Sequence, residues 1–315
     1  MLLKKKDTVY FFFSGKGGVG KTSIAAASAL WFSRNRKKTL IISTDPAHSL
    51  SDSFKINIGG DIKRIDKNLF AVEIEPKKAM EEYKEKFSPE IEKIGMLKGM
   101  GIGDIFDTAG MTPGIDEVAA FDKFLSYMNS REYDVIIFDT APTGHALRFL
   151  SLPEVIDSWL GKMIKLRLKF SGFVNVFKKM MPFGSDKEEP SIGTDFLEEM
   201  KQRIKSAREI LSDPKKTHYN LVIIPEDMSI LETERSLKVM AEYNIPVETV
   251  IVNKLIPENM ECKFCSAKRK QQQEKVSVIN KKFNRFRILN LPLFEREIRG
   301  LEALQAVSQK LYGNN

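Results

Sequence analysis

The feature that most constrains the fold is a glycine-rich loop, Ser14–Thr22 (SGKGGVGKT), between two apolar segments. Before it, Val9–Phe13 is an uninterrupted apolar run, typical of a strand buried on both faces. After it, Ile24–Phe32 predicts a helix. Glycines let backbone N–H groups converge on phosphate oxygens, and the helix directs its positive end at the same anion. The loop therefore predicts a nucleotide site, with Lys21 on the β- and γ-phosphates and the Thr22 hydroxyl on Mg²⁺.

A second lysine, Lys16, stands at the start of this loop, although an ordinary phosphate loop needs only one. Within its own chain Lys16 has no obvious phosphate to contact. The pattern resembles the signature-lysine class of phosphate-loop ATPases, in which the extra lysine of each subunit reaches the nucleotide of the other. The resemblance implies a homodimer in which Lys16 and Lys21 both serve catalysis.

Composition sets broader limits. The 315 residues are 42% hydrophobic and 29% charged, enough for a substantial core in one or two domains. We see no segment apolar and long enough to span a bilayer, and the apolar run behind Lys4–Lys6 is too short for a signal peptide. With two cysteines and a nucleotide site, we expect a cytoplasmic protein. The net charge of +8 is spread along the chain, and we expect no nucleic-acid partner.

Further apolar runs predict six more strands, Thr39–Thr44, Leu69–Ile74, Tyr133–Phe138, Tyr219–Ile224, Val247–Val252 and Phe286–Leu291. Strands that alternate with helices predict an α/β fold, a three-layer phosphate-loop NTPase core with a mostly parallel sheet. Two helical insertions interrupt the pattern. We expect the nucleotide-binding core to comprise 1–75, 131–152 and 212–315, and a helical cargo-binding subdomain to comprise 76–130 and 153–211.

Two carboxylates follow predicted strands, where ligands of parallel sheets bind. Asp139 alone would more simply cap a turn, but together with Thr22 it predicts a Mg²⁺ site. Asp45 lies in a polar loop, and we expect its carboxylate to orient or deprotonate the attacking water. Asn253-Lys-Leu-Ile256 resembles the start of a guanine-recognition motif, but Ile256 replaces the carboxylate that guanine requires. We therefore expect ATP rather than GTP.

The order of several longer motifs resembles the arsenite-pump ATPase family; they are FSGKGGVGKTS, STDPAHSLSDSF, DTAPTGHALRFLSLP, VIIPED, IVNKL and LPLFEREIRGLEAL. The single-copy length, the methionine-rich insertions and one CxxC are most similar to its branch for tail-anchored protein targeting in the Get pathway. The resemblance implies hydrolysis of ATP to ADP and phosphate, Asp45 on the catalytic water, Asp139 near Mg²⁺, and a membrane receptor as partner. Ser49 departs from the asparagine expected there.

The resemblance also implies a set of nucleotide contacts. On the phosphates it places the loop residues Gly15, Lys16, Gly17, Gly18, Val19, Gly20, Lys21, Thr22 and Ser23. It places Glu226 and Asn253 on ATP, and Pro292 and Leu293 near the adenine.

The cysteines form one local pair, Cys262-Lys-Phe-Cys265. CxxC spacing lets two thiolates face one ion, but structural zinc takes four ligands, and His218 is remote in the sequence. A complete Zn²⁺ site therefore requires two chains related by a twofold axis. A redox pair and two unremarkable thiols remain alternatives.

The insertions carry apolar residues at helical spacing. Such a stripe is usually core, but unbranched methionines adapt to helices of varied sequence. We expect a groove for the transmembrane segment of a tail-anchored protein, lined by Met96, Met100, Ile105, Met111, Trp159, Met163, Phe170, Phe173 and Phe177.

The leading hypothesis is thus a dimeric ATPase that captures a transmembrane helix when ATP closes the dimer. Three alternatives remain. One is the catalytic subunit of a metalloid efflux pump, which a single-copy chain without a cysteine cluster fits less well. The others are a partitioning ATPase on DNA or membranes, and an ATP-independent, redox-switched holdase.

Overall fold

The structure is a computed structural model that describes residues 8–45, 49–75, 77–79, 81–82, 85, 115–140, 194–258 and 261–313. At 115–119, 121, 194–201 and 204 only the backbone is described. The nine residues expected to line a cargo groove lie outside the described residues. Among the described helices, none is both long and apolar enough to cross a membrane.

One sheet of eight strands runs through the molecule in the order β3-β4-β2-β5-β1-β6-β7-β8. The strands are β1 Val9–Ser14, β2 Thr39–Ser43, β3 Lys63–Asp66, β4 Leu69–Glu73, β5 Val135–Asp139, β6 Thr217–Ile223, β7 Val247–Leu255 and β8 Arg287–Pro292. All neighbours are parallel except β3 and β4 at one edge. The predicted α/β fold with a mostly parallel sheet is confirmed. The strand β3 was not predicted, because this charged edge strand has no apolar run.

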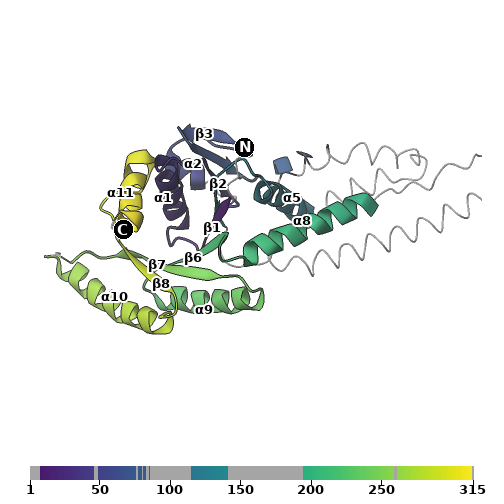
Figure 1. Cartoon of the computed structure of the whole chain (residues 1–315). Helices are drawn as coiled ribbons and strands as arrows, with labels where there is room; N and C mark the ends of the chain where they lie inside the picture. Colours follow the sequence, from purple (N-terminus) through teal and green to yellow (C-terminus); the bar gives the residue numbers. More distant parts are fainter. Residues whose placement is uncertain are drawn as a thin grey trace, which may run out of the picture.

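Helices cover both faces of the sheet (Figure 1). They are α1 Lys21–Arg34, α2 Ser49–Phe54, α5 Ile115–Met128, α8 Thr194–Ser212, α9 Asp227–Glu242, α10 Lys263–Lys282 and α11 Gly300–Tyr312. On one face, α1, α2 and α11 share a hydrophobic cluster with the sheet. On the other face, α5, α8, α9 and α10 do so. The result is the three-layer arrangement expected for alternating strands and helices.

The two faces are packed in different ways. Phe12 in the central strand β1 stacks on Phe138 of β5 and Tyr219 of β6, with ring centroids 4.8 and 4.9 Å apart. Each such ring removes a large apolar area from water and contributes roughly 2 kcal/mol. On the opposite face α1 presents Ala25–Ala27, which are fully buried. Small side chains let this helix lie close to the sheet, which fixes the loop that precedes it.

The inner ends of both insertions pack into the core. Phe124 and Met128 of α5 and Leu211 of α8 belong to the same hydrophobic cluster as the sheet. Arg203 of α8 and Asp122 of α5 form an ion pair at 2.5 Å. The division into a core and a separate helical subdomain stays a prediction, because the greater part of each insertion lies outside the described residues.

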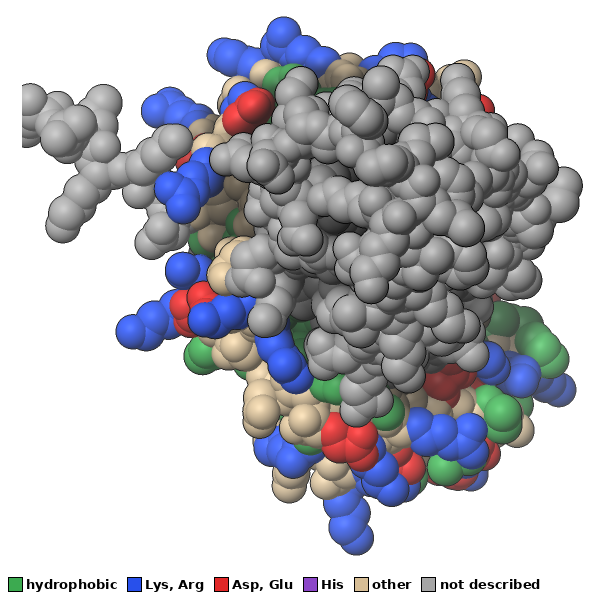
Figure 2. Space-filling view, turned by 90° about the vertical axis from the view of Figure 1, so that its right-hand side faces the viewer, with side chains coloured by type: hydrophobic (Ala, Val, Ile, Leu, Met, Phe, Trp, Pro, Cys, Tyr) green, Lys and Arg blue, Asp and Glu red, His purple; other side chains and the backbone are tan. Residues whose placement is uncertain are grey.

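Charge is distributed widely over the surface. Figure 2 shows Lys and Arg side chains all around the described rim of one face, with acidic side chains among them. Several are paired, as in Lys275 with Asp227 at 2.6 Å. The described charges on this rim are thus of both signs (Figure 2).

Candidate functional site

The glycine-rich loop joins β1 to α1, and close approaches of other segments explain two of its glycines. Gly15 has φ +152°, and a Cβ there would lie 2.1 Å from the carbonyl oxygen of Val222 in β6. Gly20 has φ +95°, and a Cβ there would lie 2.5 Å from Nδ2 of Asn253. Both positions therefore exclude a side chain. The loop is held against the carboxyl ends of β6 and β7, where ligands of parallel sheets bind.

Lys21 begins α1 and lies inside this loop, only 6% exposed. Its Nζ donates to the main-chain oxygen of Lys16 at 3.1 Å. Burial lowers the pKa of Lys21, and the carboxylates of Asp139 and Asp45 act in the opposite direction. The loop lysine and the two predicted carboxylates thus lie in one electrostatic cluster. Lys16 is half-buried, and among the described residues its ammonium has no hydrogen-bond partner.

Asp139 ends β5 and is almost fully buried, 1% exposed. Burial raises the pKa of Asp139 to about 7, while hydrogen bonding by Thr22 and the charge of Lys21 lower it. Ser43 Oγ donates to Oδ2 at 3.5 Å, but Oδ1 has no hydrogen-bond partner in the described part of the chain. A buried carboxylate oxygen without a hydrogen-bond partner destabilises the fold. Mg²⁺ binds oxygen ligands of this kind. Thr22 and Asp139 thus fit Mg²⁺ by their chemistry, and their assignment as its ligands stays a prediction.

Asp45 follows β2, and its N–H donates to Ser43 Oγ at 3.2 Å. The loop that it opens ends at α2, where the hydroxyls of Ser49 and Thr22 are 3.2 Å apart. Residues 46–48 between them lie outside the described residues. Asp45 is therefore held at its backbone in the same electrostatic cluster as Lys21, and its action on the attacking water stays a prediction.

Glu73 anchors the far side of this loop and was not predicted. It ends β4, is 2% exposed, and accepts from the N–H of Ser51 at 2.9 Å and from its hydroxyl at 2.8 Å. A buried carboxylate that accepts two hydrogen bonds fixes the start of α2. The available signal was the acidic residue at the end of the apolar strand LFAVE.

A cavity of about 420 Å³ lies beside the loop and α1. Its lining includes Gly20, Ser23, Asn253, Pro292 and Leu293, which were all predicted as nucleotide contacts. The N–H of Leu293 donates to the oxygen of Leu255 at 2.7 Å and ties this side of the cavity to β7. The volume suits a nucleoside. The individual contacts stay predictions.

Glu226, the predicted nucleotide contact that follows β6, does not line this cavity. It is exposed at the N-terminus of α9, beyond the end of β6. Its contact with ATP stays a prediction.

The whole chain matches a known family. Residues 8–313 fit the family described as anion-transporting ATPase. The chain belongs to the anion-transporting ATPase family. It is 38% identical to ATPase GET3B of Arabidopsis thaliana, covering 94% of this chain and 77% of that protein. It is 36% identical to ATPase GET3 of Podospora anserina, covering 98% and 92%, and to ATPase get3 of Schizosaccharomyces pombe, covering 98% and 93%. This ATPase therefore hydrolyses ATP, as predicted.

The cysteine pair of this ATPase lies at the start of α10. Cys262 caps the helix, and the N–H of Cys265 donates to its Sγ at 3.5 Å. Hydrogen bonds from Cys265 and from the N–H of Phe264 lower the pKa of Cys262, which favours the thiolate that binds metals. In the described ranges, no three His, Cys, Asp or Glu side chains group as metal ligands. One chain thus supplies two thiols here.

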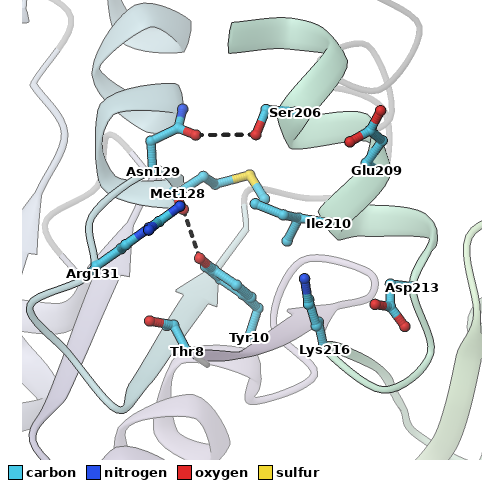
Figure 3. A pocket seen from close by; sticks show the side chains of 10 residues that line it. All are labelled: Thr8, Tyr10, Met128, Asn129, Arg131, Ser206, Glu209, Ile210, Asp213 and Lys216. Carbon is cyan, nitrogen blue, oxygen red and sulfur yellow. Dashed lines mark hydrogen bonds between the residues drawn. The ribbon is translucent and has the colours of Figure 1, made fainter. Parts of the chain in front are cut away.

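A second cavity, of about 550 Å³, lies at the opposite end of β1 (Figure 3). Thr8 lines it, whereas the phosphate loop starts at Ser14, about 20 Å further along an extended strand. The ends of α5 and α8 form its other walls, and the Tyr10 hydroxyl donates to the Met128 oxygen at 2.6 Å. This cavity lies where the ends of α5 and α8 meet the start of β1, away from the nucleotide site.

Proposed function

We propose that this ATPase binds the transmembrane helix of tail-anchored membrane proteins and targets them for membrane insertion. The observation that carries the proposal is the similarity to ATPase GET3 proteins over nearly the whole chain. It agrees with the phosphate loop, the cluster around Asp139 and the two insertions that the sequence places between the strands. ATP binding closes a hydrophobic groove, and hydrolysis reopens it.

Five side chains have distinct roles at the nucleotide site. Lys21 neutralises the β- and γ-phosphates. Thr22 and Asp139 would hold Mg²⁺, which would supply charge stabilisation to the phosphates. Asp45 orients the attacking water and accepts its proton. Lys16 reaches the nucleotide of the partner subunit, which would explain why its ammonium has no hydrogen-bond partner among the residues described in its own chain.

The same homodimer completes a zinc site. Cys262 is exposed at the start of α10, and Phe264, between the two cysteines, is 70% exposed. An exposed ring beside two thiols favours a contact that covers both. Two chains related by a twofold axis supply four thiolates, the set that structural Zn²⁺ takes. Zinc would thus hold the dimer while the nucleotide sites open and close.

The fold offers a direct connection from the nucleotide to the insertions. The chain passes from α5 into β5 within seven residues, and β5 ends at Asp139. At the start of this path, Tyr10 of β1 fixes the Met128 carbonyl at the end of α5. A shift at the metal site therefore displaces α5, and through the ion pair of Asp122 with Arg203 it displaces α8. The residues predicted to line the groove precede these two helices in the sequence.

Co-expression with a tail-anchored protein tests the proposal. The ATPase is purified and the bound protein is identified and quantified. The control is the same cargo with two arginines in its transmembrane segment, which makes burial in an apolar groove costly. We expect the apolar cargo to co-purify and the arginine variant to be lost. Retention of both, or of neither by protein that hydrolyses ATP, contradicts the proposal.

The family description names anion transport, so metalloid efflux is the second candidate. It predicts that arsenite accelerates hydrolysis at constant ATP. We expect no acceleration, because the described residues offer no thiol beyond the CxxC pair to bind arsenite.

A further inference from the structure

Two neighbouring residues of β7 bind consecutive carbonyls of the phosphate loop. Asn253 Nδ2 donates to the Val19 oxygen at 2.8 Å, and Lys254 Nζ donates to the Gly18 oxygen at 2.7 Å. Asn253 is buried, 4% exposed, whereas Lys254 is exposed. The contacts show that both side chains act on the loop itself.

Lys254 makes this contact from an unfavourable backbone conformation. Its φ is +61°, in the left-handed region that residues with a Cβ rarely adopt. The pairing of β7 with β8 is irregular between Val252 and Leu255, so the strand bulges at this point. Strain of this kind persists where surrounding structure imposes it, and it is often found at functional sites.

Gln272 of α10 holds the strained segment in place. Its Nε2 donates to the Lys254 oxygen at 3.0 Å, and its Oε1 accepts from the N–H of Ile256 at 2.9 Å. One side-chain amide thus satisfies two backbone groups on either side of Leu255, where the bulge ends. These bonds link α10 to the residue that contacts the phosphate loop.

The geometry of the peptide unit shows what these contacts achieve. In a trans peptide the C=O and N–H groups point in opposite directions. No cis peptide occurs among the described residues. Fixing the carbonyls of Gly18 and Val19 against Lys254 and Asn253 therefore turns the N–H groups of Val19 and Gly20 to the other side of the loop. Converging N–H groups are what a glycine-rich loop offers to phosphate oxygens.

We propose that Lys254, held by Gln272, is a positioning residue that pre-orients the N–H groups of the phosphate loop toward the nucleotide phosphates. The inference rests on the ATPase activity that the family shows, and not on the proposed cargo. Pre-orientation contributes equally to binding of ATP and of its transition state, since the cradle is the same in both. Loss of the contact should therefore raise KM and leave kcat nearly unchanged.

The test uses Lys254→Met, which keeps the aliphatic stem beside the nucleoside cavity and removes the donor. KM for ATP and the inhibition constant of inorganic pyrophosphate are measured. We expect both to rise about tenfold, with kcat within about twofold of wild type. Pyrophosphate has no base or ribose, so a lost contact with the nucleoside cannot explain its weaker binding. Unchanged KM and pyrophosphate inhibition overturn the proposal.

A second pair of variants separates positioning from stability. Lys254→Gly removes the contact and also the left-handed strain, while Arg36→Gly relieves the same strain at φ +62° in the turn between α1 and β2. We expect both to unfold at a temperature no lower than wild type, but only Lys254→Gly to raise KM about tenfold. Equal KM values for the two variants would overturn the proposal. Gln272→Ala should also raise KM, because it removes the two hydrogen bonds that hold the segment around Lys254.

Discussion

Replacing Asp139 by asparagine should remove a large pH dependence from the stability of the metal-free, nucleotide-free protein. Burial raises the pKa of Asp139 to about 7 from 3.8. The folded state therefore binds more protons than the unfolded state between these two pH values. Protons favour the state that binds more of them. This carboxyl therefore lowers the free energy of unfolding as the pH rises from 3.8 to about 7. The destabilisation is complete only above about pH 7.

The magnitude follows from the two pKa values. A difference of about 3 pKa units corresponds to about 4 kcal/mol at pH 8, at 1.36 kcal/mol per unit. At pH 5 less than half of this destabilisation is already present, since the unfolded carboxyl is ionised there. Between pH 5 and pH 8, Asp139 should thus lower the free energy of unfolding by roughly 2 to 3 kcal/mol.

Urea unfolding with EDTA at both pH values measures this change. Other groups also titrate, so the informative quantity is the wild-type change minus the change in Asp139→Asn. Asp134→Asn, at the other end of β5, controls for the loss of one negative charge. We expect a difference of roughly 2 to 3 kcal/mol for Asp139→Asn. If wild type and Asp139→Asn lose equal stability between pH 5 and pH 8, the Asp139 carboxyl is not buried as described, and the basis for its role at Mg²⁺ fails.

Three further predictions test the proposed roles. Asp45→Asn should keep ATP binding and lose most turnover, because it acts on water rather than on the nucleotide; unchanged turnover rejects that role. Metal analysis should find one zinc per two chains, and Cys262→Ser should weaken the dimer while ATP binding persists; one zinc per chain would require ligands besides Cys262 and Cys265. Met100→Asp and Phe173→Asp should abolish cargo capture while hydrolysis continues; if a variant instead unfolds or loses hydrolysis, that position is core.

The buried strands could be predicted from the sequence because burial on both faces demands an unbroken apolar run. The strand β1 was predicted at Val9–Phe13 and extends to Ser14, one residue further. The strand β6 starts at Thr217, two residues before the prediction, because polar Thr217 and His218 pair with β1 at the end of the ladder. The edge strand β3 was not predicted, because its side chains are partly exposed to solvent and so need no apolar pattern.

The residues of the nucleotide site could be predicted from the sequence, but the long-range contacts between them could not. The phosphate loop, Asp45 and Asp139 follow from local motifs, and the structure brings them into one cluster. The contacts that hold the cluster join distant residues, as when Lys254 reaches Gly18 across 236 positions or Arg299 binds Asp52 across 247. No local pattern marks such pairs. The roles of the cysteines and of the groove residues depend on a second chain and on a cargo, and so they stay predictions.

Coupling between nucleotide and cargo is the central claim, and the binding of a labelled transmembrane peptide tests it most directly. Its affinity is measured by fluorescence anisotropy without nucleotide, with ADP and Mg²⁺, and with ATP and Mg²⁺ on the Asp45→Asn variant, which holds ATP. We expect the ATP-held state to bind the peptide at least about tenfold more tightly than the ADP state, a coupling of about 1.4 kcal/mol. Equal affinity in all three states, in protein whose wild-type form hydrolyses ATP, would contradict the account.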